Sequence, residues 1–172
     1  MRKSLTRVSS DCAVFFRGTT LALAIAMALL MGSMAGCSRP SANPSRAEPV
    51  VLRVSSEGEF LAFVPTELTC PAGARVRLIF KHGGQRVPQK HNWVLILPGA
   101  SQEIEKAGAA AGEAAGWLPK NDQRVLAATP LCSPGDEAVI DFAAPGPGDY
   151  PYICSTPGHA FEMHGVLHVT KS

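Results

Sequence analysis

Near its C-terminus the chain reads Cys154-Ser-Thr-Pro-Gly-His159-Ala-Phe-Glu-Met163, which places a thiolate, an imidazole and a thioether within ten residues. We expect this stretch to form a single loop between the last two strands of the fold. A second imidazole comes from His91, at the start of the apolar residues 92–97. A soft thiolate, two imidazoles and a weak thioether are the ligands that hold copper in a trigonal site with one long axial bond. The sequence therefore predicts a copper site built from one short loop and one distant strand.

Each of these residues also has a simpler interpretation. Cys154 alone is compatible with a buried free thiol, and Met163 with ordinary core packing. His91, at the start of a strand, is compatible with a hydrogen-bonded core histidine. The order and spacing of all four residues around Pro157 and Gly158 favour the copper site. A rigid site of this kind is a compromise between the geometries that Cu(I) and Cu(II) prefer, so we expect electron transfer with little rearrangement.

The motif Cys-x-x-Pro-Gly-His-x-x-x-Met, with His-Asn-Trp at residues 91–93, resembles the azurin-type cupredoxins, which are type 1 blue copper proteins. Within that family, the sequence resembles auracyanins and lipid-anchored azurins more than other members. The resemblance extends over about residues 50–171. It implies that His91, Cys154 and His159 are the in-plane copper ligands and that Met163 is the weak axial ligand.

The resemblance also implies roles for neighbouring residues. In azurins the carbonyl before the first histidine, usually from glycine, is a second and distant axial contact, and Lys90 holds that position here. We expect Asn92 and Ser155 to support the ligands by hydrogen bonding, although an Asn turn is the alternative for Asn92. Thr156 stands where azurins often carry phenylalanine, and a hydroxyl near the sulfur would shift the reduction potential. His82 aligns with a histidine that titrates near copper in some azurins, but a solvated turn histidine fits equally well.

Residues 50–172 are predicted to be one all-β domain, a Greek-key cupredoxin β-sandwich of antiparallel strands with one short inserted helix. Short apolar runs alternate with turn signals, and strands are expected at 50–56, within 60–68, and at 75–80, 92–97, 137–142 and 165–170. The continuous apolar run at 92–97 predicts a strand buried on both faces. The Ala- and Glu-rich residues 101–115 predict the helix, with Ser101 as N-cap and Gly116 as its stop. Gly108 and Gly112 should each weaken that helix by about 1 kcal/mol.

Cys70 and Cys132 are not expected to form a disulfide, although exported proteins tend to pair such residues. The strand directions place Cys70 at the end of the sandwich opposite the copper site and Cys132 near that site. A six-residue strand separates its ends by about 20 Å. A disulfide requires Cα atoms within about 7 Å.

Residues 1–36 are predicted to be a lipoprotein signal peptide. A basic start is followed by an apolar run at 19–30 and then by small residues. Residues 34–37, Met-Ala-Gly-Cys, resemble the bacterial lipobox, which implies cleavage before Cys37 and diacylation of that cysteine. The alternatives are a plain signal peptide or an uncleaved anchor helix, because the uncharged residues 18–36 could just span a bilayer. Residues 37–49 would then be the lipid-anchor cysteine and a flexible, Pro-rich linker.

Composition excludes several functions. The first 36 residues hold four basic and one acidic side chain, which leaves 12 basic and 13 acidic side chains in the rest of the chain. This near-neutral balance gives no reason to expect a nucleic-acid partner. A chain of 172 residues has no room for the second domain and further copper centres of copper oxidases, so we do not expect an enzyme.

The function predicted from the sequence is electron transfer by one copper ion in a membrane-tethered protein on the periplasmic side of a bacterial membrane or on the cell surface. We expect a monomer that binds redox proteins of a respiratory or photosynthetic chain, such as c-type cytochromes, only weakly. Electrons would pass through the imidazole of His159, whose edge reaches solvent inside an apolar patch in the resembled family. The alternative function is a copper-binding chaperone or storage protein.

Overall fold

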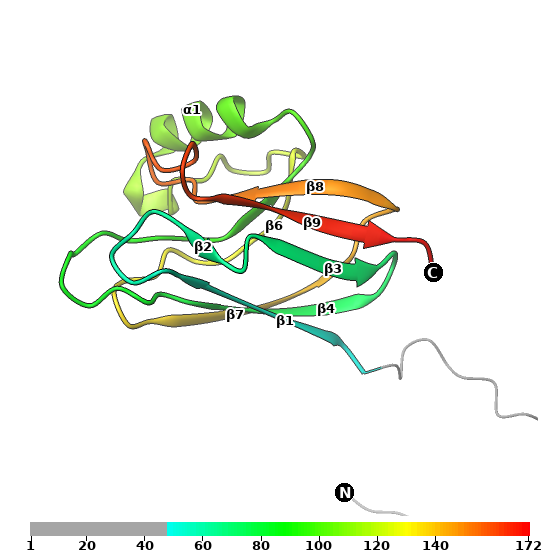
Figure 1. The fold of residues 1–172 in the computed structure, drawn as a ribbon. Helices are drawn as coiled ribbons and strands as arrows, with labels where there is room; N and C mark the ends of the chain where they lie inside the picture. Colours follow the sequence, from blue (N-terminus) through cyan, green and yellow to red (C-terminus); the bar gives the residue numbers. More distant parts are fainter. Residues whose placement is uncertain (1–47) are drawn as a thin grey trace, which may run out of the picture. The chain divides into compact units, whose positions relative to one another are not determined.

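The computed structural model describes residues 48–172, which form two β-sheets packed face to face with one α-helix beside them (Figure 1). The predicted signal peptide and nearly all of the predicted linker lie outside the described residues. The strands are β1 (Val50–Ser56), β2 (Phe63–Val64), β3 (Glu67–Pro71), β4 (Arg75–Lys81), β5 (Val94–Ile96), β6 (Val125–Ala128), β7 (Glu137–Ala143), β8 (Gly148–Ile153) and β9 (His164–Thr170). Helix α1 (Ser101–Ala111) is followed by the 3-10 helix η2 (Glu113–Ala115). The predicted all-β sandwich with one inserted helix is confirmed.

The two sheets are mixed rather than purely antiparallel. One has the strand order β2-β1-β4-β7 and the other β3-β9-β8-β5-β6. β1 pairs with β4 in parallel, and so does β3 with β9, which corrects the expectation of a wholly antiparallel sandwich. The reason is that the segment predicted as one β-rich run divides into β2 in the first sheet and β3 in the second. The chain therefore leaves the first sheet after β2 and returns to it as β4.

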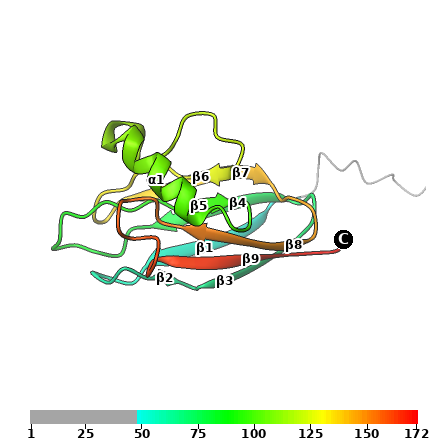
Figure 2. The same cartoon turned by 90° about the horizontal axis from the view of Figure 1, so that it is seen from above.

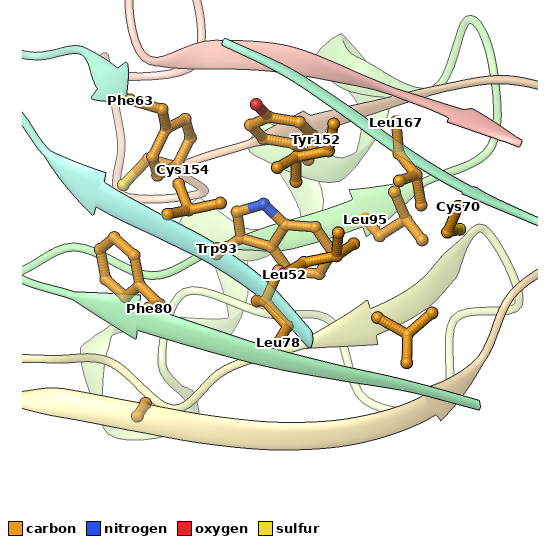
Figure 3. Close-up of a cluster of buried hydrophobic side chains, with 14 of the residues drawn as sticks. Leu52, Phe63, Cys70, Leu78, Phe80, Trp93, Leu95, Tyr152, Cys154 and Leu167 are labelled. Carbon is orange, nitrogen blue, oxygen red and sulfur yellow. The ribbon is translucent and has the colours of Figure 1, made fainter. Parts of the chain in front are cut away.

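The main core lies between the sheets, where alternating residues of each strand face inward. Trp93 is fully buried, with its ring centroid 5.5 Å from that of Tyr152 and 6.0 Å from that of Phe142. Phe63 packs edge-on against both Tyr152 and Phe80. Figure 3 shows the rings of Phe63, Phe80, Trp93 and Tyr152 between the sheets. This rigid aromatic layer supports the end of the sandwich at which the candidate site lies.

Strand β5 is buried on both of its faces, as its apolar run predicted. Leu95 belongs to the main core, whereas Val94 and Ile96 face a second cluster with Ile104 of α1. The apolar side of α1 thus covers the outer face of β5. Within residues 48–172, no helix is both long and apolar enough to cross a membrane.

The helix begins at Ser101, the first residue of the predicted run, but its N-cap differs from the prediction. Ala100 occupies the N-cap position and no side chain caps the helix, so the prediction of Ser101 as N-cap is wrong. α1 ends at Gly112, and Gly116 instead ends η2 with a left-handed backbone at φ 69°. Gly108 does more than weaken the helix, because a Cβ there would lie 2.1 Å from the carbonyl oxygen of Trp117.

Strand β6 was not predicted from the sequence. Its residues Val-Leu-Ala-Ala are only half-buried and carry a weak β signal, and they become a strand by pairing with β5. Cys70 and Cys132 lie where the strand directions placed them. Cys132 is bonded through its backbone to His91, whereas Cys70 pairs with Val169 near the far end of β9, and both thiols are free.

Candidate metal centre

Four residues singled out in the sequence meet at one end of the sandwich. His91 precedes β5 and is held by two backbone hydrogen bonds to Cys132, of 3.0 and 2.8 Å. Cys154 follows β8, and His159 lies on the loop between β8 and β9. Met163 comes directly before β9 and is fully buried. The loop from Cys154 to Met163, called here the ligand loop, therefore connects two neighbouring strands of one sheet.

Three donor atoms converge on one point. The Sγ of Cys154 lies 3.7 Å from the Nδ1 of His91 and 3.6 Å from the Nδ1 of His159, and the two Nδ1 atoms are 3.2 Å apart. A metal with bonds of about 2.0 to 2.3 Å to three surrounding ligands requires donor atoms between about 3 and about 4 Å apart. All three side chains are buried. The triangle therefore has the dimensions and the donor set of a trigonal copper site.

The ligand loop is shaped by its own backbone hydrogen bonds. His159 N–H donates to the Thr156 carbonyl at 3.0 Å, and Gly158 has φ 82°, so residues 156–159 form the type of turn that requires glycine at its third position. Met163 N–H then donates to the His159 carbonyl at 2.8 Å, and Cys154 N–H donates to the Met163 carbonyl at 3.0 Å. These bonds bring both ends of the loop together and hold the backbone of Met163 against that of Cys154 and His159. Met163 as a metal ligand stays a prediction.

Without a metal, the three ligands prefer their uncharged forms. Burial raises the pKa of the Cys154 thiol, and hydrogen bonds from Thr156 and from the backbone of Asn92 oppose that shift. Burial, together with the nearby His82 and His159 rings, lowers the pKa of His91 to about 4. Burial also lowers the pKa of His159. The two Nδ1 atoms face each other, so they cannot both carry a proton. At least one of the two neutral rings therefore presents an Nδ1 lone pair that can bind a cation.

Asn92 and Ser155 link the two parts of the site. The Asn92 Oδ1 accepts a hydrogen bond of 2.9 Å from Ser155 N–H, and its Nδ2 donates to the Ser155 hydroxyl at 2.8 Å. The same Nδ2 donates to the Gly116 carbonyl at 2.9 Å. Asn92 thus ties the residue after His91 to the residue after Cys154, and both to the segment that follows α1.

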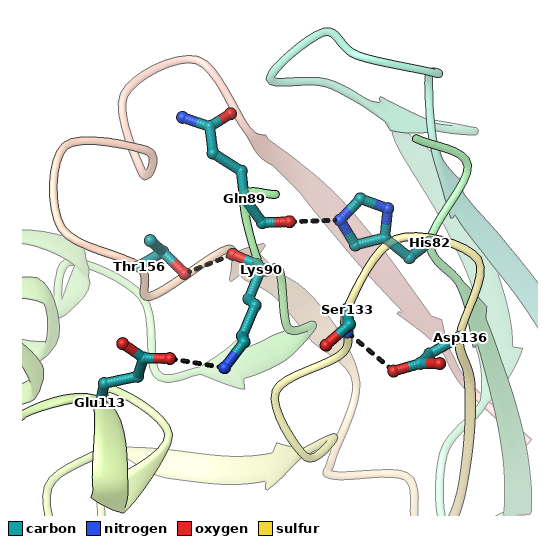
Figure 4. A network of polar contacts seen from close by, with 7 residues as sticks. All are labelled: His82, Gln89, Lys90, Glu113, Ser133, Asp136 and Thr156. Atoms are coloured by element: carbon teal, nitrogen blue, oxygen red, sulfur yellow. Dashed lines mark hydrogen bonds and ion pairs between the residues drawn. The ribbon is translucent and has the colours of Figure 1, made fainter. Parts of the chain in front are cut away.

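The carbonyl of Lys90, a candidate distant axial contact, accepts a hydrogen bond of 2.9 Å from the Thr156 hydroxyl (Figure 4). The Lys90 ammonium is 2.6 Å from the Glu113 carboxylate. This pair joins the residue before His91 to η2. A contact between the Lys90 carbonyl and a metal stays a prediction.

His82 is buried rather than solvated, which excludes one of its two interpretations. Its ring is stacked on that of His91, with centroids 4.5 Å apart. Its Nε2 lies 2.9 Å from the Gln89 carbonyl, and Gly84 N–H donates to its Nδ1 at 3.1 Å (Figure 4). These contacts define the neutral tautomer with the proton on Nε2.

Two carboxylates near the site were not found from the sequence. Glu105 of α1 accepts a hydrogen bond of 2.8 Å from Gly158 N–H, on the ligand loop. Glu59 accepts three backbone hydrogen bonds, from residues 85–87, and holds the connection that leads to His91. Both contacts depend on how separate segments dock, and no local pattern around Glu59 or Glu105 signals them.

The comparisons with known proteins agree with this geometry. Residues 50–170 match the family model of copper binding proteins, the plastocyanin/azurin family. The chain is 36% identical over 161 residues to auracyanin-A of Chloroflexus aurantiacus, which covers 91% of this chain and 98% of that protein. It is also 32% identical over 118 residues to the azurin of Methylobacillus flagellatus, covering 65% of this chain and 80% of that azurin.

Solved structures give the same result. The structure of auracyanin A, described as a "blue" copper protein from Chloroflexus aurantiacus, superimposes with a TM-score of 0.67 at 40% identity. The match covers 72% of this chain and the whole of that structure. A fold, a donor triangle and a family match that all point to copper lead to one assignment: the chain belongs to the plastocyanin/azurin family of copper-binding proteins.

Proposed function

We propose that this protein is a type 1 copper electron-transfer protein, in which His91, Cys154 and His159 would hold the ion and Met163 would be a weak fourth ligand. The observation that carries the proposal is the buried triangle of one sulfur and two nitrogens with sides of 3.2 to 3.7 Å. Copper supplies a one-electron couple to such a site. The protein is then a carrier and not an enzyme.

The surrounding residues give the site its stiffness. Asn92 fixes the distance between the strand that begins at His91 and the ligand loop. The backbone bonds of His159 and Met163 hold the loop in a single conformation. A site held in this way changes little when the metal gains or loses an electron, and this favours a carrier over a chaperone, whose site must release its metal.

Electrons are proposed to pass through the ligand loop, which is the exposed part of the site. His159 itself is only 6% exposed, so its edge is more covered than the resemblance implied. Pro157 and Gly158 are exposed, and Phe161 is 88% exposed two residues beyond His159. We propose that this surface meets redox proteins such as c-type cytochromes in weak, short-lived complexes.

The test is the optical and electron-paramagnetic spectrum of the copper-loaded protein and of Cys154→Ser. We expect an intense thiolate-to-Cu(II) absorption in the wild type and its loss in the variant, with the far-ultraviolet circular dichroism unchanged. Cys70→Ser is the matched control, because Cys70 is also buried but lies far from the site. Unchanged colour in Cys154→Ser would remove this residue from the site, and binding of colourless Cu(I) alone would support the chaperone or storage function.

We also propose that the protein is exported and tethered through lipid on Cys37, with residues 37–49 as the linker and 50–172 as the copper-binding domain. The support is the lipobox-like sequence at residues 34–37. In a bacterial host, the wild type should incorporate labelled fatty acid and sediment with membranes, whereas Cys37→Ala should not incorporate label. Equal labelling of Cys12→Ala and the wild type is the expected control result. Labelling that survives in Cys37→Ala would reject this anchor.

A further inference from the structure

The inserted segment formed by α1 and η2 contacts both parts of the metal centre. In Figures 1 and 2, α1 lies beside the ligand loop between β8 and β9. Glu105 binds the loop at Gly158, Glu113 pairs with Lys90 before His91, and the Gly116 carbonyl accepts from Asn92 after His91. Three contacts from one segment therefore reach residues next to the candidate ligands: the backbone of Gly158 and the side chains of Lys90 and Asn92.

The Glu105 contact is the one closest to the exposed part of the site. Its Oε1 accepts the Gly158 N–H at 2.8 Å, and Gly158 is the left-handed residue of the turn that presents His159. The bond fixes the orientation of the Pro157–Gly158 peptide, one residue before His159. A charge-assisted hydrogen bond of this kind is stronger than one between neutral groups.

The charge of Glu105 is also not neutralised by an ion pair. Within residues 48–172 no lysine or arginine pairs with Glu105, whereas Glu113 has Lys90 and Asp122 has Arg124. The negative charge of the Glu105 carboxylate acts on both Cys154 and His159 by raising the pKa of each. It favours the neutral thiol over the thiolate at Cys154 and the cationic ring over the neutral one at His159. A negative charge beside a metal stabilises the higher of two oxidation states.

We propose that Glu105 is a positioning residue for the copper centre, which holds the ligand loop through Gly158 and favours the oxidised over the reduced form of the site by its negative charge. This inference rests on the proposed electron-transfer function. Glu105 touches neither the metal nor a ligand side chain, so its effect is transmitted through the loop backbone and through space.

The experiment compares the full-length protein in detergent with three variants. Glu105→Gln keeps a hydrogen-bond acceptor and removes the charge, Glu105→Ala removes both, and Glu103→Gln removes an exposed charge from the same helix. The reduction potential of the copper-loaded protein and the amide hydrogen exchange of Gly158 in the copper-free protein are measured for each. The second measurement does not depend on the metal.

Both Glu105 variants should raise the reduction potential by about 59 mV. For a one-electron couple, this shift corresponds to a tenfold change in the Cu(I)/Cu(II) ratio at a fixed electrode potential. Only Glu105→Ala should speed exchange at Gly158, and Glu103→Gln should change neither quantity. An unshifted potential in Glu105→Gln, or an equal shift in Glu103→Gln, would refute the charge effect. Unchanged exchange in Glu105→Ala would refute the positioning role. Absence of the blue absorption in the wild type would instead reject the proposed function, while the exchange result would still test the loop contact.

Discussion

The candidate ligands could be identified from the sequence because three of the four lie within ten residues of each other. The order Cys154, His159, Met163 and the Pro-Gly pair between them specify a loop and a chemistry at once. Glu105 and Glu59 could not be predicted in the same way. Their partners are backbone N–H groups in segments 53 and at least 26 residues away, and only the docked fold brings them into contact.

The lowered pKa of His91 should make the free energy of unfolding of the copper-free protein depend on pH. Burial, followed by the effects of His82 and His159, lowers its pKa from 6.5 to about 4. Between these values the unfolded chain binds a proton that the folded protein does not, so stability is complete above pH 6.5 and falls as the pH drops toward 4. The loss attributable to His91 is on the order of 3 kcal/mol. The lowered pKa of His159 acts in the same direction.

Urea unfolding of the copper-free protein at a series of pH values across this window measures the effect. His91→Gln should flatten the pH dependence of the free energy of unfolding, because the titrating ring is gone. His168→Gln is the control, since His168 lies on the half-exposed side of β9 beside Asp149. A dependence that is as steep in His91→Gln as in the wild type would contradict the assignment.

Among the elements, the strands with alternating or continuous apolar residues were predicted well, and the short ones were not. β4 alternates buried and exposed residues, and β5 is apolar throughout, so the sequence of each indicates how it is covered. β6 is a strand because it pairs with β5, and its Ala-rich sequence does not indicate that pairing. Likewise, the division of one β-rich run into β2 and β3 follows from the change of sheet and not from local propensity.

For a substitution at Gly108 of α1, helix propensity and packing have opposite effects on the stability of the protein. Alanine is favoured over glycine within a helix by about 1 kcal/mol, so Gly108→Ala should stabilise the protein if propensity alone decided. A Cβ at this position would instead lie 2.1 Å from the carbonyl oxygen of Trp117 and 2.9 Å from its carbonyl carbon. Backbone atoms cannot move aside as a flexible side chain can. We therefore expect Gly108→Ala to destabilise the protein by about 1 to 3 kcal/mol.

Chemical denaturation of Gly108→Ala and Ala109→Gly tests this expectation. Ala109 is exposed on the same helix, so its substitution reports propensity alone and should cost about 1 kcal/mol. Both variants should then be less stable than the wild type, for different reasons. A Gly108→Ala protein more stable than the wild type would show that α1 does not pack against the backbone at Trp117.

For the molecule as a whole, net charge and exposed apolar surface contribute differently to association with a redox partner. Beyond the predicted signal peptide the chain carries 12 basic and 13 acidic side chains, so it offers little net charge for long-range attraction. The ligand loop, in contrast, exposes Phe161 almost completely. Association should therefore depend on short-range apolar contact at the loop more than on electrostatic steering.

Stopped-flow measurement of electron exchange with a soluble c-type cytochrome separates these two contributions. Raising the salt from about 20 to about 200 mM shortens the Debye length several-fold, yet the second-order rate constant should change by less than about threefold. Phe161→Ala should slow the reaction at every salt concentration, because it removes the apolar group that projects from the ligand loop. Val139→Ala, a change at a half-exposed apolar residue of β7, should leave the rate unaltered. A tenfold fall in rate with salt, or equal rates for Phe161→Ala and Val139→Ala, would show that partners are recognised by charge or on another face.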